Sequence, residues 1–86
     1  MPEICRFFGI IIKMFHSDHA PPHFYAEYGQ YEAIININTL ALIGGKLPPR
    51  ALGLVIEWAT QHQEKLKVLW QKAENLEPLT KIEPLS

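Results

Sequence analysis

Three of the four histidines in this 86-residue chain lie within one short segment, together with an aspartate. His16, His19 and His23 surround Asp18 and a Pro21-Pro22 step. Imidazole and carboxylate groups at this density can bind Zn²⁺, which takes nitrogen and oxygen ligands in a tetrahedral array. They can also act as general acids and bases near neutral pH, for example in the hydrolysis of an RNA phosphodiester. This segment is therefore the candidate chemical site.

Both kinds of chemistry lack features that usually accompany them. The ligand spacing of familiar zinc motifs such as HExxH is missing, so no cofactor is expected, with Zn²⁺ as the alternative. Only Lys13 and Arg6 lie near the segment in sequence to hold a phosphate. A structural role competes with the chemical ones: Asp18 can accept hydrogen bonds from backbone N–H groups of its own turn, and the histidines can tie down a proline-rich loop. Both interpretations stay open at this point.

The flanking sequence predicts an antiparallel β-meander of three to five strands over residues 1–47. Two apolar runs, 4–8 and 10–15, meet at Gly9, which predicts a break between two pairings. Segments 23–28 and 31–38 alternate polar and apolar residues, as half-buried strands do. The two residues between them fit a hairpin turn, and a short last strand is expected over 40–43. If 10–16 and 23–28 form a hairpin, His16 and His23 face each other across the loop mouth.

Residues 48–75 predict one long helix that packs on one face of this sheet. Pro48-Pro49 suits the first helical turn, where a missing N–H does no harm. Apolar residues then recur at three- and four-residue steps, which indicates one buried stripe. Trp58 lies off this stripe, so we expect its indole either at the surface or against the C-terminal tail or a partner subunit.

Residues 76–86 contain two prolines and therefore predict an extended tail that folds back on the domain. The chain is too short for a second core, so we expect a single α+β domain over 1–86. The formal charge of −1 offers no positive field for nucleic acid. One cysteine excludes an intramolecular disulfide, and no apolar run is long enough to span a membrane. A cytoplasmic protein is expected.

Several segments resemble a family of small bacterial proteins called domain of unknown function 4160. The most specific is Asp18-His19-Ala20-Pro21-Pro22-His23-Phe24, and the others are Leu47-Pro48-Pro49-Arg50-Ala51-Leu52, Glu57-Trp58 and Lys81-Ile82-Glu83-Pro84-Leu85. Many members carry a further histidine where this chain has Tyr25, which disfavours a metal cluster here. The resemblance implies a cytoplasmic protein, often encoded beside another small domain in an arrangement like a toxin–antitoxin pair. It implies no established activity.

Two functions therefore remain as expectations. The first is a non-enzymatic protein-interaction module whose partner is a small protein encoded nearby or a second copy of the chain. Its candidate binding residues are Asp18, His19, His23, Tyr25 and Trp58. The second is a small histidine-dependent nuclease or hydrolase, or a metal-binding domain. Its candidate catalytic or ligand residues are His16, Asp18, His19 and His23.

Overall fold

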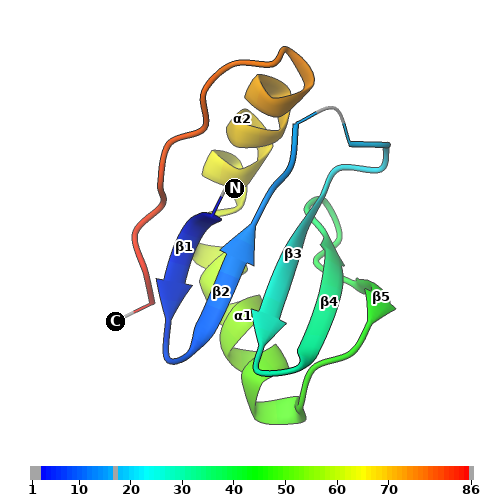
Figure 1. Cartoon of the computed structure of the whole chain (residues 1–86), viewed down its shortest axis with the longest axis vertical. Helices are drawn as coiled ribbons and strands as arrows, with labels where there is room; N and C mark the ends of the chain where they lie inside the picture. Colours follow the sequence, from blue (N-terminus) through cyan, green and yellow to red (C-terminus); the bar gives the residue numbers. More distant parts are fainter. Residues whose placement is uncertain (1–2, 17, 86) are drawn as a thin grey trace.

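The computed structural model describes residues 3–16 and 18–85, which fold as one five-stranded sheet with two helices against one of its faces (Figure 1). Each strand pairs antiparallel with the next in chain order. The strands are β1 (Glu3–Phe7), β2 (Ile10–Lys13), β3 (His23–Tyr28), β4 (Tyr31–Asn36) and β5 (Leu42–Gly45). The helices are α1 (Pro49–Gln61) and α2 (Gln63–Glu74). The predicted α+β class and antiparallel meander are confirmed.

Tight turns set the register of the first four strands. Phe8 and Gly9 join β1 to β2, and both have positive φ, 49° and 80°, as a type I′ turn requires. The predicted break at Gly9 is thus a hairpin. Gly29 has a φ of 59° in the predicted two-residue turn between β3 and β4. That turn aligns all six pairs from His23 opposite Asn36 to Tyr28 opposite Tyr31.

The last strand begins two residues later than predicted. The side-chain oxygen of Asn36 accepts hydrogen bonds from the N–H groups of Asn38 and Thr39, so the chain turns where segment 40–43 was expected to begin pairing. Leu40 completes the turn with a φ of 61°. Pairing then includes Gly45, where a Cβ atom would overlap a backbone carbonyl oxygen of β4. Only glycine fits at position 45, where φ is also positive at 67°.

The single long helix predicted over 48–75 is instead two helices. A straight helix of that length would extend about 42 Å, whereas the longest dimension of the molecule is 33 Å. His62 interrupts it with a φ of −122°, and its N–H donates to the carbonyl oxygen of Ala59 at 3.2 Å. The Gln63 side chain then donates to the carbonyl oxygens of Ile37 and Asn38, which anchors the start of α2 beyond the end of β4.

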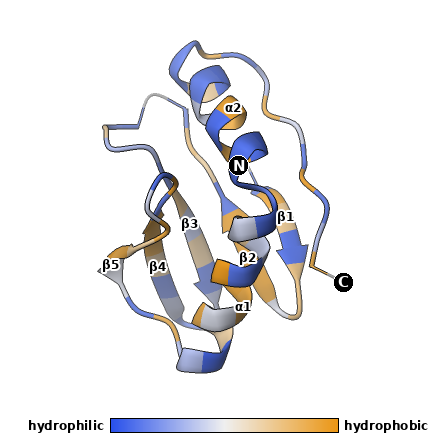
Figure 2. Cartoon of the chain, turned by 180° about the vertical axis from the view of Figure 1, so that it is seen from behind, coloured by the Kyte–Doolittle hydropathy of each residue, from blue (hydrophilic) through white to orange (hydrophobic). Residues whose placement is uncertain are grey.

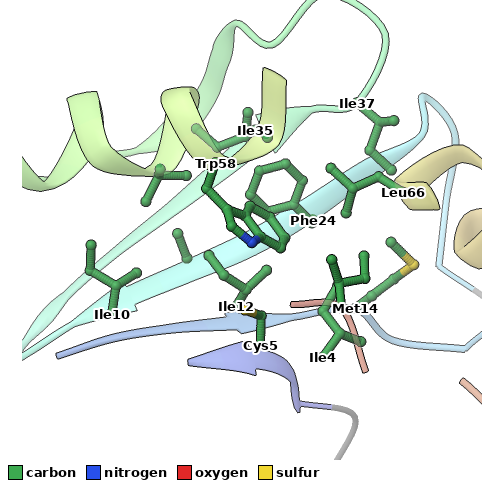
Figure 3. Close-up of a cluster of buried hydrophobic side chains, with 14 of the residues drawn as sticks. Ile4, Cys5, Ile10, Ile12, Met14, Phe24, Ile35, Ile37, Trp58 and Leu66 are labelled. Atoms are coloured by element: carbon green, nitrogen blue, oxygen red, sulfur yellow. The ribbon is translucent and has the colours of Figure 1, made fainter. Parts of the chain in front are cut away.

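The core lies between the sheet and the helices, with Trp58 at its centre (Figure 3). Trp58 is fully buried, and its ring lies 5.6 Å from that of Phe7 and 5.9 Å from that of Phe24. Its indole N–H donates to the carbonyl oxygen of Glu83 at 2.8 Å. Of the two expected environments, contact with the tail is therefore the one observed, and the indole has no exposed surface for a partner.

The tail lies along β1, as the extended conformation of residues 77–85 allows (Figure 1). The Ile82 N–H donates to the Ile4 carbonyl oxygen at 2.8 Å, and Ile82 and Leu85 are buried. The outward sides of the helices carry many hydrophilic residues (Figure 2). In the described part of the chain, no helix is long and apolar enough to cross a membrane.

Candidate functional site

The histidine loop, residues 16–23, connects β2 to β3 at the end of the sheet that lies beside α2 (Figure 1). Asp18 is the centre of its hydrogen bonding. One carboxylate oxygen accepts the backbone N–H of His19 at 2.9 Å. The other accepts a ring N–H of His23 at 3.0 Å and the hydroxyl of Tyr25 at 3.1 Å. The loop is thereby tied to the first residues of β3.

His23 uses both of its ring nitrogens inside the protein. Nε2 faces the Asp18 carboxylate, and Nδ1 lies 2.7 Å from the carbonyl oxygen of Pro21. Both neighbours are hydrogen-bond acceptors, so each contact uses a ring N–H as its donor. The ring is 7% exposed and lies 5.2 Å from the ring of Trp70 and 5.4 Å from that of Tyr25. The ring thus packs edge-on against Tyr25 and at a tilt against Trp70, which closes it off from solvent.

The electrostatics of Asp18 agree with an ionised carboxylate. Partial burial pushes its pKa upward, but the hydrogen bonds from the His19 backbone, Tyr25 and His23 outweigh burial and hold the pKa below its ordinary value. The pKa of Tyr25 is raised by burial and by donating its hydroxyl to Asp18. Asp18 and His23 therefore form a mostly buried hydrogen-bonded pair, with the carboxylate as the acceptor.

The other two loop histidines lie apart from this pair. Nε2 of His16 lies 2.8 Å from the carbonyl oxygen of Glu77, at the start of the tail. Pairing of β2 with β3 ends at Lys13 opposite Tyr25, so the strands do not carry His16 to a position facing His23. The His19 side chain is exposed, and its ring has no hydrogen-bond partner among the described residues.

The loop does not gather a metal-ligand set. Across residues 3–16 and 18–85, no three His, Cys, Asp or Glu side chains lie close enough together to hold a metal ion. A histidine ligand must also present an unprotonated ring nitrogen, and both nitrogens of His23 face acceptors. The arrangement can instead fix the conformation of the loop and the position of the segments that it contacts.

One of those segments leads to β5. The carbonyl oxygen of Pro22 accepts the N–H of Ile37 at 2.9 Å, and Ile37 lies in the connection from β4 to β5. The same connection accepts the Gln63 side chain from α2. The histidine loop, α2 and the start of the β4–β5 turn are therefore one hydrogen-bonded unit, and the loop helps to position the last strand.

The two edges of the sheet differ in how they are covered. The edge of β1 is covered by the tail, through the Ile82 bond and the burial of Ile82 and Leu85. β5 pairs only with β4 among the described residues, and Figure 1 shows nothing beyond it. Two of its side chains are large, apolar and exposed: Leu42 at 42% and Ile43 at 47%. The edge of β5 is thus a second candidate site.

Sequence reasoning grouped Asp18, His23 and Tyr25, and the structure brings these three together. It did not identify Trp70, which the apolar stripe places in the core and which also covers the His23 ring. Nor did it identify the role of the Pro21 carbonyl oxygen. A lone Trp in a helical stripe gives no sign of the loop that it contacts, because that contact depends on where α2 lies after the break at His62.

Comparison with protein families matches residues 9–71 to the family described as "Domain of unknown function (DUF4160)". The match spans most of the chain, from the turn after β1 into α2, and it includes the histidine loop and β5. No curated protein and no solved structure matches the chain.

Proposed function

The chain belongs to the DUF4160 family, and we propose that it is a non-enzymatic protein-interaction module to which a small partner protein adds a strand at the free edge of β5. The observation that carries this proposal is the contrast between the two sheet edges. The C-terminal tail covers the edge of β1, whereas no residue that the structure describes pairs with the outer edge of β5. An open edge presents unpaired backbone N–H and C=O groups, which are a template for another strand.

The sequence of β5 supports this use of the edge. Proteins commonly protect an edge strand with lysine, proline, an inward-facing charge or a bulge. β5 has a bulge, since Ile34 pairs with Gly44 and Ile35 with Leu42. It has no charge and no proline, and its Leu42 and Ile43 side chains are exposed. A partner strand would cover apolar surface as well as pair with the backbone.

The short length of β5 limits the affinity that strand addition alone can provide. Each new backbone hydrogen bond contributes on the order of 1 kcal/mol, and covering the rest of Leu42 and Ile43 adds roughly 1 kcal/mol for each side chain. Association itself costs about 4 kcal/mol or more. Four residues therefore give weak binding, and a stable complex needs the partner to contact a second surface.

The histidine loop has a supporting role in this proposal. The Asp18–His23 pair fixes the loop, and the Pro22 carbonyl oxygen holds Ile37 at the start of the connection to β5. The Asp18–His23 pair is thus connected to the β5 end of the sheet through Pro22 and Ile37. The partner we propose is a small protein encoded nearby, in a pair like that of a toxin and its antitoxin, within the cytoplasm.

The test is an affinity purification of the tagged full chain at its native level, followed by binding measurements with the purified partner. Ile43→Lys puts a charge on the β5 edge at an exposed position, so the fold should tolerate it. Val68→Lys is the matched control, because Val68 is 51% exposed on α2. We expect Ile43→Lys to weaken the complex at least tenfold and Val68→Lys to leave it unchanged. Equal binding by both variants would refute the β5 interface.

A further inference from the structure

A pocket of about 270 Å³ lies at the end of the sheet opposite the histidine loop. It is formed where the β1–β2 and β3–β4 hairpins turn beside the first residues of α1 (Figure 1). Its lining is mostly apolar and includes Phe8, Ile10, Tyr28, Pro48, Leu54 and the side chain of Arg50. This pocket has no part in the loop chemistry or in the β5 edge described above.

Phe8, at the border of the pocket, has a strained backbone conformation. It has a φ of 49°, in the left-handed region where Asn and Gly are favoured and a bulky side chain is strained. The residue is nevertheless 62% exposed, so burial of the side chain does not offset this strain. Tyr28 beside it is also exposed. A strained, exposed aromatic that borders a pocket is a feature of binding sites.

Arg50 gives the pocket its charge. It is the one ionisable side chain in the lining, apart from the phenol of Tyr28. Among residues 3–16 and 18–85, no carboxylate lies within ion-pair distance of its guanidinium. The first turn of α1 carries no acidic residue either. An occupant of complementary charge would therefore bring a carboxylate to an otherwise apolar pocket.

We propose that this pocket binds a segment of the partner protein in which a large apolar side chain has an acidic residue beside it. The volume suits one large side chain and is below the roughly 300–1,000 Å³ of pockets that enclose a small-molecule ligand. The apolar side chain occupies the space beside Phe8, Tyr28 and Leu54, and the carboxylate pairs with Arg50. This inference rests on the proposed function, because it supplies the second surface that the short β5 edge needs.

The chain path makes one partner segment able to reach both surfaces. Gly45 ends β5, and Pro48 of the pocket follows three residues later. Three residues span at most about 11 Å. The Pro48 side of the pocket is thus close to the end of β5. Ile10 lies in β2, three strands from β5, so a partner strand paired with β5 needs several further residues to cross to the space beside Phe8.

The binding test adds each of three capped tripeptides, at millimolar concentration, to the full chain. Binding is followed by the changes in the protein's amide chemical shifts in NMR spectra. The peptides are acetyl-Glu-Phe-Glu-amide, its Gln-Phe-Gln analogue and its Glu-Ala-Glu analogue. We expect the first to shift signals of the pocket residues, the neutral analogue to bind about two- to fivefold more weakly, and the alanine analogue roughly tenfold or more weakly. Absence of shifts at the pocket, or equal binding by all three peptides, would overturn the proposal.

Two variants make the assignment specific. Arg50→Gln should abolish the difference between the Glu and Gln peptides, while Lys67→Gln on α2 should preserve it. Phe8→Asn should weaken the Glu-Phe-Glu peptide severalfold and leave the melting temperature unchanged or higher, because Asn suits the left-handed turn. A merely structural Phe8 would show unchanged peptide binding in Phe8→Asn, and that result would also contradict the proposal.

The peptide experiment needs no identified partner, so its failure can be separated from failure of the proposed function. If Ile43→Lys abolishes the partner complex but the peptides do not bind, strand addition at β5 is supported and the pocket proposal is wrong. If the peptides bind as expected but Ile43→Lys has no effect on the complex, the pocket proposal is supported and strand addition at β5 is refuted.

Discussion

Nε2 of His23 lies 3.0 Å from a carboxylate oxygen of Asp18, and both side chains are largely withdrawn from solvent. The opposite ring nitrogen lies 2.7 Å from the carbonyl oxygen of Pro21. A histidine in this position has no free nitrogen for a substrate or a metal. The hydrogen bonds of Asp18 and His23 therefore connect the histidine loop to β3.

Replacement of Asp18 by Asn should make stability less sensitive to acid. The folded-state pKa of Asp18 is lowered, so the stabilisation that it gives is present above its unfolded value of about 3.9. That stabilisation is lost as the pH falls through the lower folded value. Urea unfolding of both proteins from neutral pH into acid measures this. We expect the stability of Asp18→Asn to be lower at neutral pH and to fall less as the pH is lowered. Parallel curves for the two proteins would contradict the stabilising role of the ionised Asp18 carboxylate.

Alanine substitution should distinguish the two central histidines of the loop by stability. His23→Ala removes a buried ring and one of the three hydrogen-bond donors to Asp18, which should cost about 2–3 kcal/mol in the free energy of unfolding. His19→Ala removes an exposed ring and should change it by less than about 0.5 kcal/mol. Denaturant melts provide both values. Equal losses would mean that the ring of His19 has contacts that this structure lacks, and no loss for His23 would refute its structural role.

Zn²⁺ should leave the melting temperature unchanged. A metal that binds only the native state raises stability in proportion to the logarithm of its concentration, but His23 has no nitrogen to offer and His16 is directed at the tail. Thermal scans with and without millimolar Zn²⁺ test this. A rise that disappears in His19→Ala would restore the metal-binding alternative for the loop.

Trp58→Phe should loosen the tail while it preserves the core. The variant retains an aromatic ring but loses the N–H that donates to Glu83, which should cost about 1 kcal/mol. Hydrogen exchange should then become faster at the amide of Ile82, which pairs with Ile4. Amides of the β3–β4 ladder serve as the internal control. Unchanged exchange at Ile82 would show that the buried side chains alone hold the tail.

Features coded by neighbouring residues could be predicted from the sequence. Gly9 and Gly29 mark both early hairpins because the backbone of a two-residue turn requires positive φ at those positions. Asp18 and Tyr25 could be grouped with His23 because all three lie within eight residues. The tail was recognised from its prolines, whose missing N–H groups exclude a long helix.

Features that depend on distant contacts could not be predicted. The break at His62 is accompanied by the anchoring of Gln63 to the segment after β4. The burial of Trp58 depends on the tail that covers it. The shift of the last strand depends on one side-chain turn at Asn36, which competes locally with continued pairing. Periodicity alone contains none of this information.

The most direct test of the β5 interface is amide hydrogen exchange of the full chain, free and in complex with its purified partner. The account predicts that exchange slows at amides of residues 42–45 on binding, while amides of β1, already beside the tail, change little. Slowing that is confined to the histidine loop or to α2, with β5 exchanging as in the free protein, would contradict it.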